Sequence, residues 1–139
     1  MITPINDSLV DLDVLAKIEP ETLTVKSPGQ YAQIVWQARQ KRASMHKSAI
    51  KWFVLRNRLP SMNTKNGRII WKILEALGKR INFTPISGLG ERVIFRDLFL
   101  KGLTLLDFGL NGKNQITAAS IPARQELRNL LVNIGEKIN

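Results

Sequence analysis

The chain contains no cysteine and a single histidine, His46. The lack of cysteine excludes a disulfide framework and a thiolate-based zinc or redox site, and one histidine cannot build a His-rich metal cluster. No run of about 18 apolar residues is present that would be typical of a membrane span. The first 13 residues are acidic, unlike the basic start of a secretory signal peptide. We therefore expect a cytoplasmic protein.

Acidic residues are also scarce, and their scarcity is uneven. The 139 residues hold 21 Lys and Arg against 11 Asp and Glu, which gives a formal net charge of +10. Residues 1–30 hold two bases and five acids, whereas residues 39–80 hold twelve bases and one acid, a net charge of +11. A positive block of this kind is typical of a protein that binds polyanions such as nucleic acids.

The length of the chain suits one domain, and its apolar patterns predict alternating strands and helices. Strands are expected at residues 2–5, 50–55 and 81–86, and Asn6, Asp7 and Ser8 are expected to cap a helical segment over residues 9–15. A loop is expected at 19–28, an extended piece at 103–108 and a turn at 111–114. Helices are expected at 31–46, 63–80, 91–100 and 123–134.

The strand in the stretch WFVLRNRLP, residues 52–60, is apolar on both faces and runs directly into charged and amide side chains. Strands of this kind, alternating with helices, predict a parallel α/β sheet that is covered on each side. Ligands of such sheets bind beyond the carboxyl ends of the strands. The amide of Asn57 offers the donor and acceptor pair that reads an adenine edge. From spacing alone, the favoured interpretation is that Asn57 only turns the chain before Pro60.

Four segments resemble one branch of a known ATPase family. They are TPINDSLVDLDVL at 3–15, LRNRL at 55–59, GLGERVIFRDLFLKGLTLLDF at 88–108 and ARQELRNLL at 123–131. Their order and spacing are similar to the MipZ branch of the ParA/MinD ATPases over essentially the whole chain. The resemblance implies a doubly wound, mostly parallel P-loop sheet with flanking helices. It also implies an ATP-dependent sandwich dimer that binds DNA nonspecifically and positions the division plane by inhibiting FtsZ and interacting with a ParB-like partition protein. A cytoplasmic, nucleoid-associated location follows from it.

The family's glycine-rich phosphate loop, with its lysines and its Ser/Thr ligand for magnesium, has no counterpart in the chain. The Gly-Lys pair in Gly112-Lys113-Asn114 lacks the hydroxyl group. We therefore expect residues 1–139 to be a single incomplete domain, the C-terminal half of such an ATPase. ATP and Mg²⁺ are expected for the complete protein, and no activity is expected for this chain alone.

The resemblance assigns two sets of residues. Asn57 and Arg58 are expected to contact the adenine, and the loop after the next strand is expected to wrap the base and ribose; that loop comprises Ser87, Gly88, Leu89, Gly90 and Glu91. For Gly88 and Gly90, turn chemistry alone is an equally good explanation. Arg92 and Arg96 lie one helical turn apart. They are expected to face DNA or the dimer partner, and a solvent-exposed helix face is the alternative.

The helix expected at 63–80 carries Lys65, Arg68, Lys72 and Lys79 on one face, with Glu75 as its only acid. Four bases on one stripe suit phosphate contacts without sequence preference. The three tryptophans, Trp36, Trp52 and Trp71, are expected in the core because each has apolar neighbours.

Two other classes of function remain open. A stand-alone DNA-binding module would share the basic stripe but would leave Asn57 and the glycine loop unexplained. A membrane-surface protein would use the last helix, in which Leu127, Leu130, Leu131, Ile134 and Ile138 oppose Arg124, Arg128 and Lys137. Docking of that helix on the sheet is the favoured interpretation, so no membrane partner is expected.

Overall fold

The computed structural model describes residues 1–19, 21–22, 24–60, 62, 64–107, 118 and 120–138, with the side chains of the last helix described to Glu136. Five strands, four α-helices and two 3₁₀ helices are formed within these residues. In chain order they are β1 (Ile2–Asn6), η1 (Asp11–Val14), β2 (Ala16–Ile18), β3 (Val25–Pro28), α1 (Gln30–Ser44), β4 (Phe53–Asn57), α2 (Lys65–Ile81), β5 (Thr84–Ile86), α3 (Val93–Leu100), η2 (Leu105–Asp107) and α4 (Ser120–Ile138).

The main sheet is three-stranded, parallel and ordered β1-β4-β5. Ile2 pairs with Phe53 and Asn6 with Asn57, while Phe53 pairs with Thr84 on the other side. The carboxyl ends of β1 and β4 therefore lie side by side. The expected α/β class with a parallel sheet is confirmed.

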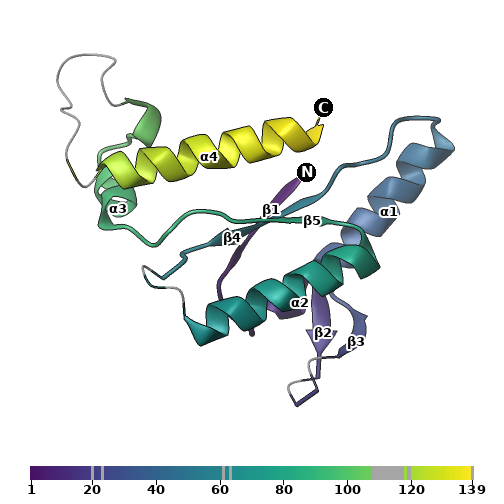
Figure 1. Cartoon of the computed structure of the whole chain (residues 1–139). Helices are drawn as coiled ribbons and strands as arrows, with labels where there is room; N and C mark the ends of the chain where they lie inside the picture. Colours follow the sequence, from purple (N-terminus) through teal and green to yellow (C-terminus); the bar gives the residue numbers. More distant parts are fainter. Residues whose placement is uncertain are drawn as a thin grey trace.

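Both faces of the central strand β4 are covered, as its apolar run predicts. Val54 packs with Leu74 and Leu77 of α2 and with Val35 of α1 in the larger core. Phe53 and Leu55, which point to the opposite face, pack with Leu130 of α4. Figure 1 shows α4 across one face of the sheet and α2 along the other.

The last helix therefore docks on the sheet, as its apolar stripe indicates. Leu130 is buried, and Leu127 and Ile134 are partly buried against the two smaller cores. Leu131 belongs to the same expected stripe but is exposed. Among the described helices, none is long and apolar enough to cross a membrane.

Helix α2 begins and ends at polar side chains that satisfy its terminal backbone groups. The Thr64 hydroxyl oxygen accepts a hydrogen bond of 3.0 Å from the Gly67 N–H, and Asn82 closes the helix in the left-handed conformation. Ile70, Leu74 and Leu77 lie on its buried side. The helix expected at 63–80 is thus found within a residue or two of the expected bounds.

The first 30 residues depart from expectation in two places. The segment expected to be helical at 9–15 is helical over only four residues, as the 3₁₀ helix η1, with Leu12 and Leu15 in the core; the Ser8 hydroxyl accepts a hydrogen bond of 3.2 Å from the Val10 N–H before it. The expected loop at 19–28 contains β3, which pairs with β2 as an antiparallel hairpin. Neither strand carries a long apolar alternation, so the local pattern was too weak to predict them.

Two further expectations need correction. Trp36 was expected in the core but is 62% exposed, whereas Trp52 is buried. The piece expected to be extended at 103–108 contains η2, in which the Asp107 carboxylate accepts hydrogen bonds from the Thr104 N–H and hydroxyl. Phe108 and the turn expected at 111–114 lie outside the described residues.

The side chain of Arg56, at the end of β4, joins three elements. Its guanidinium forms an ion pair of 2.6 Å with the Asp7 carboxylate beyond β1 and donates a hydrogen bond of 3.2 Å to the Gly67 carbonyl of α2. It also lies 5.6 Å from the centre of the Trp71 ring. Asp7 therefore does not serve as the expected helix cap.

Replacing Asp7 with alanine should destabilise the chain by about 3 kcal/mol, because the Asp7 and Arg56 side chains are only 5% and 12% exposed and the remaining guanidinium would lose its charge partner. Urea unfolding measures the loss. Asp97→Ala, a change of the same type at an exposed residue of α3, should stay within about 0.5 kcal/mol. A loss below about 1 kcal/mol for Asp7→Ala would contradict this assignment.

Candidate functional site

The end of β4 and the loop after β5 are joined by backbone hydrogen bonds at the carboxyl edge of the sheet. The Leu89 N–H donates to the Arg56 carbonyl at 3.2 Å, and the Leu59 N–H donates to the Leu89 carbonyl at 3.1 Å. The Glu91 N–H then donates to the Leu59 carbonyl at 2.9 Å. The two segments expected to form one site are thus brought together, with their backbones fixed relative to each other.

The close approach of the 87–91 loop to the end of β4 requires glycine at position 88. A Cβ atom at Gly88 would lie 1.7 Å from the carbonyl oxygen of Arg56, closer than any two non-bonded atoms can come. The neighbouring Leu89 packs against the cluster of Phe53 and Leu55. Ser87 is exposed, so the loop presents a short polar surface above an apolar anchor.

Asn57 is the last residue of β4 and is partly buried. Its backbone carbonyl accepts a hydrogen bond of 3.2 Å from the Asp7 N–H. Within the part of the chain that the structure describes, its side-chain amide has no hydrogen-bond partner. A donor and an acceptor therefore remain available at the edge where ligands of parallel sheets bind.

Arg58 adopts a left-handed backbone, with φ of 55°, and its guanidinium pairs with the Glu91 carboxylate at 2.8 Å. The hydrogen bond from Arg58 and then its charge lower the pKa of Glu91, and the same contacts raise the pKa of Arg58. Both side chains are exposed. The pair links the residue after Asn57 to the end of the 87–91 loop.

Glu126 of α4 anchors the loop from the other side, a role that the sequence analysis missed. Its carboxylate accepts hydrogen bonds from the Gly90 N–H at 3.1 Å and from the Arg92 guanidinium at 2.5 Å and 3.2 Å. Burial, the largest influence, raises the pKa of Glu126, but these hydrogen bonds and the Arg92 charge outweigh it and leave the pKa below its ordinary value. The only signal in the sequence was an unassigned acid between two arginines, Arg124 and Arg128.

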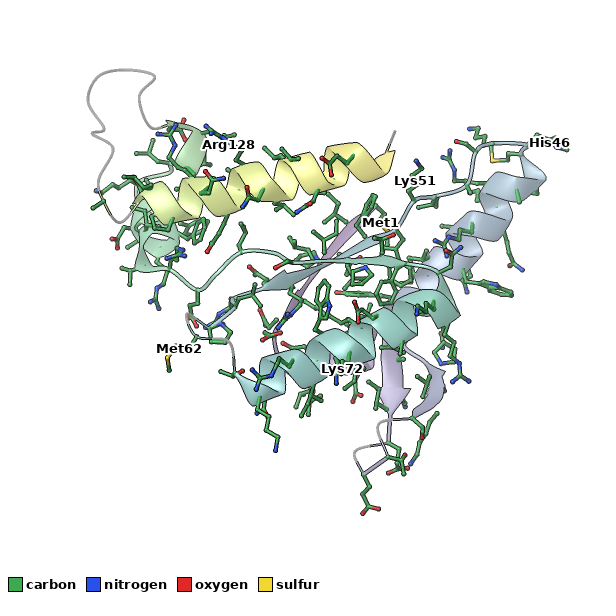
Figure 2. The ribbon with its side chains drawn as sticks, viewed as in Figure 1. Met1, His46, Lys51, Met62, Lys72 and Arg128 are labelled. Carbon is green, nitrogen blue, oxygen red and sulfur yellow. The ribbon has the colours of Figure 1, made fainter. Side chains whose placement is uncertain are left out.

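The expected DNA-binding residues lie on two elements. The bases of the α2 stripe, Lys65, Arg68, Lys72 and Lys79, are all exposed on the side opposite the buried face. Figure 2 shows Lys72 on the side of α2 that is turned away from the sheet. Within the described residues none of the four forms an ion pair.

Arg92 and Arg96 differ in their surroundings. Arg92 directly precedes α3, is partly buried and is held by Glu126. Arg96, one turn later, is exposed. A DNA contact therefore stays a prediction for both, with Arg96 the more accessible of the two.

A parallel α/β sheet with its covered faces and with loops gathered at the carboxyl edge defines a class of ligand-binding α/β proteins. A family model described as ATPase MipZ matches residues 1–137. The chain therefore belongs to the MipZ ATPase family, and its fold is consistent with part of a P-loop fold. None of the curated proteins matches the chain.

The residues present fit one end of the nucleotide that an ATPase binds. The free amide of Asn57 and the backbone of the 87–91 loop suit a base and ribose. No glycine-rich loop with lysine and Ser/Thr occurs in residues 1–139 to hold phosphates. Among the described residues, no group of three acidic or histidine side chains could hold a metal ion.

Gly88→Ala should destabilise the chain by about 2 kcal/mol or more, because the new methyl group forces the loop away from the Arg56 carbonyl. Gly135→Ala is a matched control in α4, where a Cβ meets nothing within 4 Å. The control should be neutral or stabilise by up to about 1 kcal/mol. Chemical unfolding and amide exchange at Leu89 measure both effects, and equal stability of the two variants would exclude the close approach at Gly88.

Proposed function

We propose that the chain supplies the base-binding half of a MipZ-type nucleotide switch that positions the division plane and acts in chromosome partition. In this proposal Asn57 and Arg58 contact the adenine, and the loop of Ser87–Glu91 surrounds the base and ribose. ATP and Mg²⁺ belong to the complete protein, in which a second segment provides the phosphate loop. The chain by itself binds neither and hydrolyses nothing.

The observation that carries the proposal is the unpartnered amide of Asn57 at the carboxyl edge. Its amide atoms are open to water, because no buried side-chain polar atom of the described residues lacks a partner, and a ligand can therefore pair with them without breaking a hydrogen bond of the fold. The surrounding backbone is fixed by three hydrogen bonds between residues 56–59 and 89–91. A rigid edge with one free donor and acceptor suits recognition of a flat heterocycle.

The free edge of β1 supports the proposal of a second half. Within the described residues β1 pairs only with β4, and Ile2, Pro4 and Asn6 are exposed on one of its faces. A parallel sheet is normally covered on both faces and extended on both sides of such a strand. A P-loop half that adds a strand beside β1 would complete the sheet.

The exposed bases of α2, with Arg92 and Arg96, form the nonspecific DNA surface in this proposal, and a nucleoid-associated, cytoplasmic location follows. The complete protein forms an ATP-dependent homodimer and interacts with a ParB-like partition protein and with FtsZ. A stand-alone DNA-binding module is the second candidate, because the α2 stripe is exposed whether or not a nucleotide is bound. The docked α4 argues against a membrane-surface protein.

The isolated chain should show no ATP hydrolysis, and co-refolding with the P-loop half of a MipZ-family ATPase should give binding of a fluorescent adenine nucleotide. Asn57→Ala should weaken that binding about tenfold, as expected for loss of a bidentate contact to the base. Asn66→Ala, at an exposed residue of α2, is the matched control and should bind as the wild type does.

Two results would contradict the half-site. One is ATP turnover by the isolated chain that survives purification and is altered by Asn57→Ala. The other is a co-refolded assembly that forms stably, as seen by size-exclusion chromatography, but binds no adenine nucleotide.

Removal of single bases from the α2 stripe should weaken DNA binding without affecting the fold. In the reassembled protein, Arg68→Ala and Lys72→Ala should each weaken binding to duplex DNA to the same degree for every DNA sequence. Each should also reduce the slope of log affinity against log salt concentration by about one unit, as expected for the loss of one phosphate contact. Their unfolding free energies should stay within about 0.5 kcal/mol of wild type. Lys17→Ala, at an exposed residue of β2, serves as the control. If both stripe variants keep the wild-type DNA affinity and salt dependence, this face of α2 does not contact DNA.

A further inference from the structure

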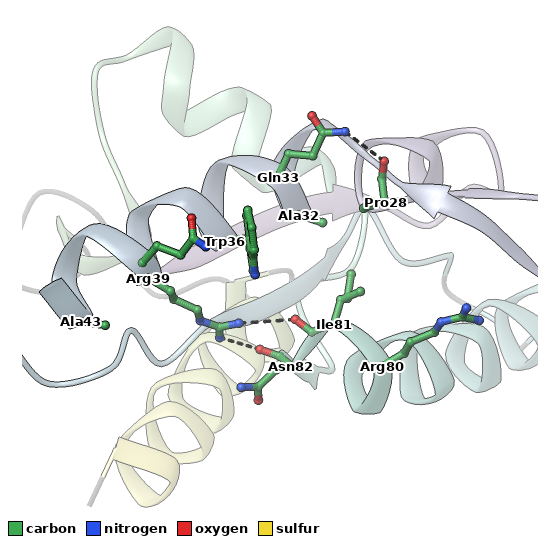
Figure 3. Close-up of a pocket in the computed structure, with 10 residues that line it drawn as sticks. Pro28, Ala32, Gln33, Trp36, Arg39, Ala43, Arg80, Ile81 and Asn82 are labelled. Atoms are coloured by element: carbon green, nitrogen blue, oxygen red, sulfur yellow. Dashed lines mark hydrogen bonds between the residues drawn. The ribbon is translucent and has the colours of Figure 1, made fainter.

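A groove of about 790 Å³ lies between α1 and the end of α2, away from the carboxyl edge of the sheet. Its apolar lining comes from Pro28, Ala32, Trp36 and Ala43 on one side and from Ile81 on the other. Figure 3 shows the Trp36 ring projecting from α1 toward this space, with Ile81 and Asn82 across from it. The groove is formed by side chains that no part of the proposed function uses.

Helix α1 is thinly packed. Of its 15 residues only Ala32 and Val35 are buried, while Ile34 and Trp36 are at least half exposed. A tryptophan with 62% of its surface in water gains a large free energy from any apolar partner that covers it. Exposed aromatic residues beside a groove are typical of the central contacts of binding sites.

The two walls of the groove are held at a fixed separation by Arg39. Its guanidinium donates to the carbonyls of Ile50, Ile81 and Asn82 at 3.2 Å, 3.4 Å and 2.6 Å. It also lies 6.0 Å from the centre of the Trp52 ring. Because the end of α2 is tied to α1 in this way, the groove is preformed, and an occupant does not have to order it.

The charge around the groove has one sign. None of its lining residues is acidic, and the sequence contains no Asp or Glu between Glu21 and Glu75. Arg80 lines the groove and, among the described residues, forms no ion pair. Lys41 and Arg42 lie in the last turn of α1.

The shape of the groove distinguishes between anionic occupants. A bilayer surface is flat and cannot fill a concave space between two helices, and a DNA backbone gains nothing from a floor of alanine, isoleucine and tryptophan. A helical peptide segment with apolar side chains on one face and carboxylates on the other satisfies both the floor and the charge. We propose that this groove docks an acidic, amphipathic segment of a partner protein, with an apolar side chain against Trp36 and Ile81 and a carboxylate on Arg80.

This docking does not depend on the proposed nucleotide half-site. Ile81 and Asn82 precede β5, whereas Asn57 ends β4 and the 87–91 loop follows β5, so the groove lies toward the opposite end of the sheet. The α2 stripe and the groove also use different residues. A partner can therefore occupy the groove whether or not the carboxyl edge is filled.

The test uses the full chain and a labelled helical peptide of about 16 residues with leucines at i, i+3, i+4 and i+7 and glutamates elsewhere on its surface. Fluorescence anisotropy should give a dissociation constant in the micromolar range. Tryptophan emission should shift to the blue on binding of the wild-type chain, and Trp36→Ala should abolish the shift. Trp36→Ala should weaken binding at least about tenfold, as for a central aromatic contact. Arg80→Glu should weaken it about fivefold or more, as for a reversed charge pair.

Matched controls are available on exposed positions outside the groove. Gln37→Ala on α1 and Lys101→Glu after α3 should change the affinity less than about twofold. Circular dichroism and thermal unfolding verify that all four variants fold. If Trp36→Ala is destabilised, Trp36→Phe, which keeps an aromatic ring, should retain most of the binding.

Four results would overturn the proposal. The first is equal binding of a peptide in which lysine replaces every glutamate, and the second is no binding of the acidic peptide at about 1 mM, the weak end of specific association. The third is that Trp36→Ala loses binding to anionic vesicles or duplex DNA but binds the acidic peptide as the wild type does. The fourth is a Trp36-dependent self-association of the chain that the acidic peptide cannot displace.

Discussion

The guanidinium of Arg56 is the contact on which the carboxyl edge depends. It forms an ion pair with Asp7 after β1, donates a hydrogen bond to the Gly67 carbonyl in the first turn of α2 and lies near the Trp71 ring. The backbone carbonyl of Arg56 accepts a hydrogen bond from the Leu89 N–H. With Asp7 only 5% exposed, the pair is costly to break from either side. One residue thereby fixes the ends of two strands, the start of a helix and the loop that follows β5.

This arrangement joins the carboxyl edge of the sheet to the basic face of α2. Arg56 forms part of a hollow of about 370 Å³ on α2 together with Arg68, Trp71 and Lys72, while its backbone holds the loop beside Asn57. Glu126 stabilises the same loop from α4 through Gly90 and Arg92. The groove beside Trp36, in contrast, is built by Arg39 at the other end of the sheet and shares none of these contacts.

Much of the fold could be predicted because it follows from short-range patterns. Helix α2 has its apolar residues at helical spacing, and β4 has an apolar run too short for a helix and ended by Arg56 and Asn57. The positive block and the family resemblance are also properties of the linear sequence. The β2–β3 hairpin could not be predicted in the same way, because it owes its formation to pairing between segments with little apolar alternation.

The sequence by itself determined the α/β class, the central strand and the location of the charge, since each depends on residues that are neighbours in the chain. Only the tertiary structure decided what those residues contact. The local sequence predicts Asp7 as a helix cap, but its carboxylate pairs with Arg56, 49 residues away in the chain. Nothing in the sequence around Glu126 predicts its hydrogen bond with the Gly90 N–H. Trp36 has apolar neighbours in sequence but faces a groove, because the separation of α1 from α2 is set by Arg39 and the backbone carbonyls of Ile50, Ile81 and Asn82. Burial and pairing arise from the packing of distant segments, and local periodicity carries no information about which segments will meet.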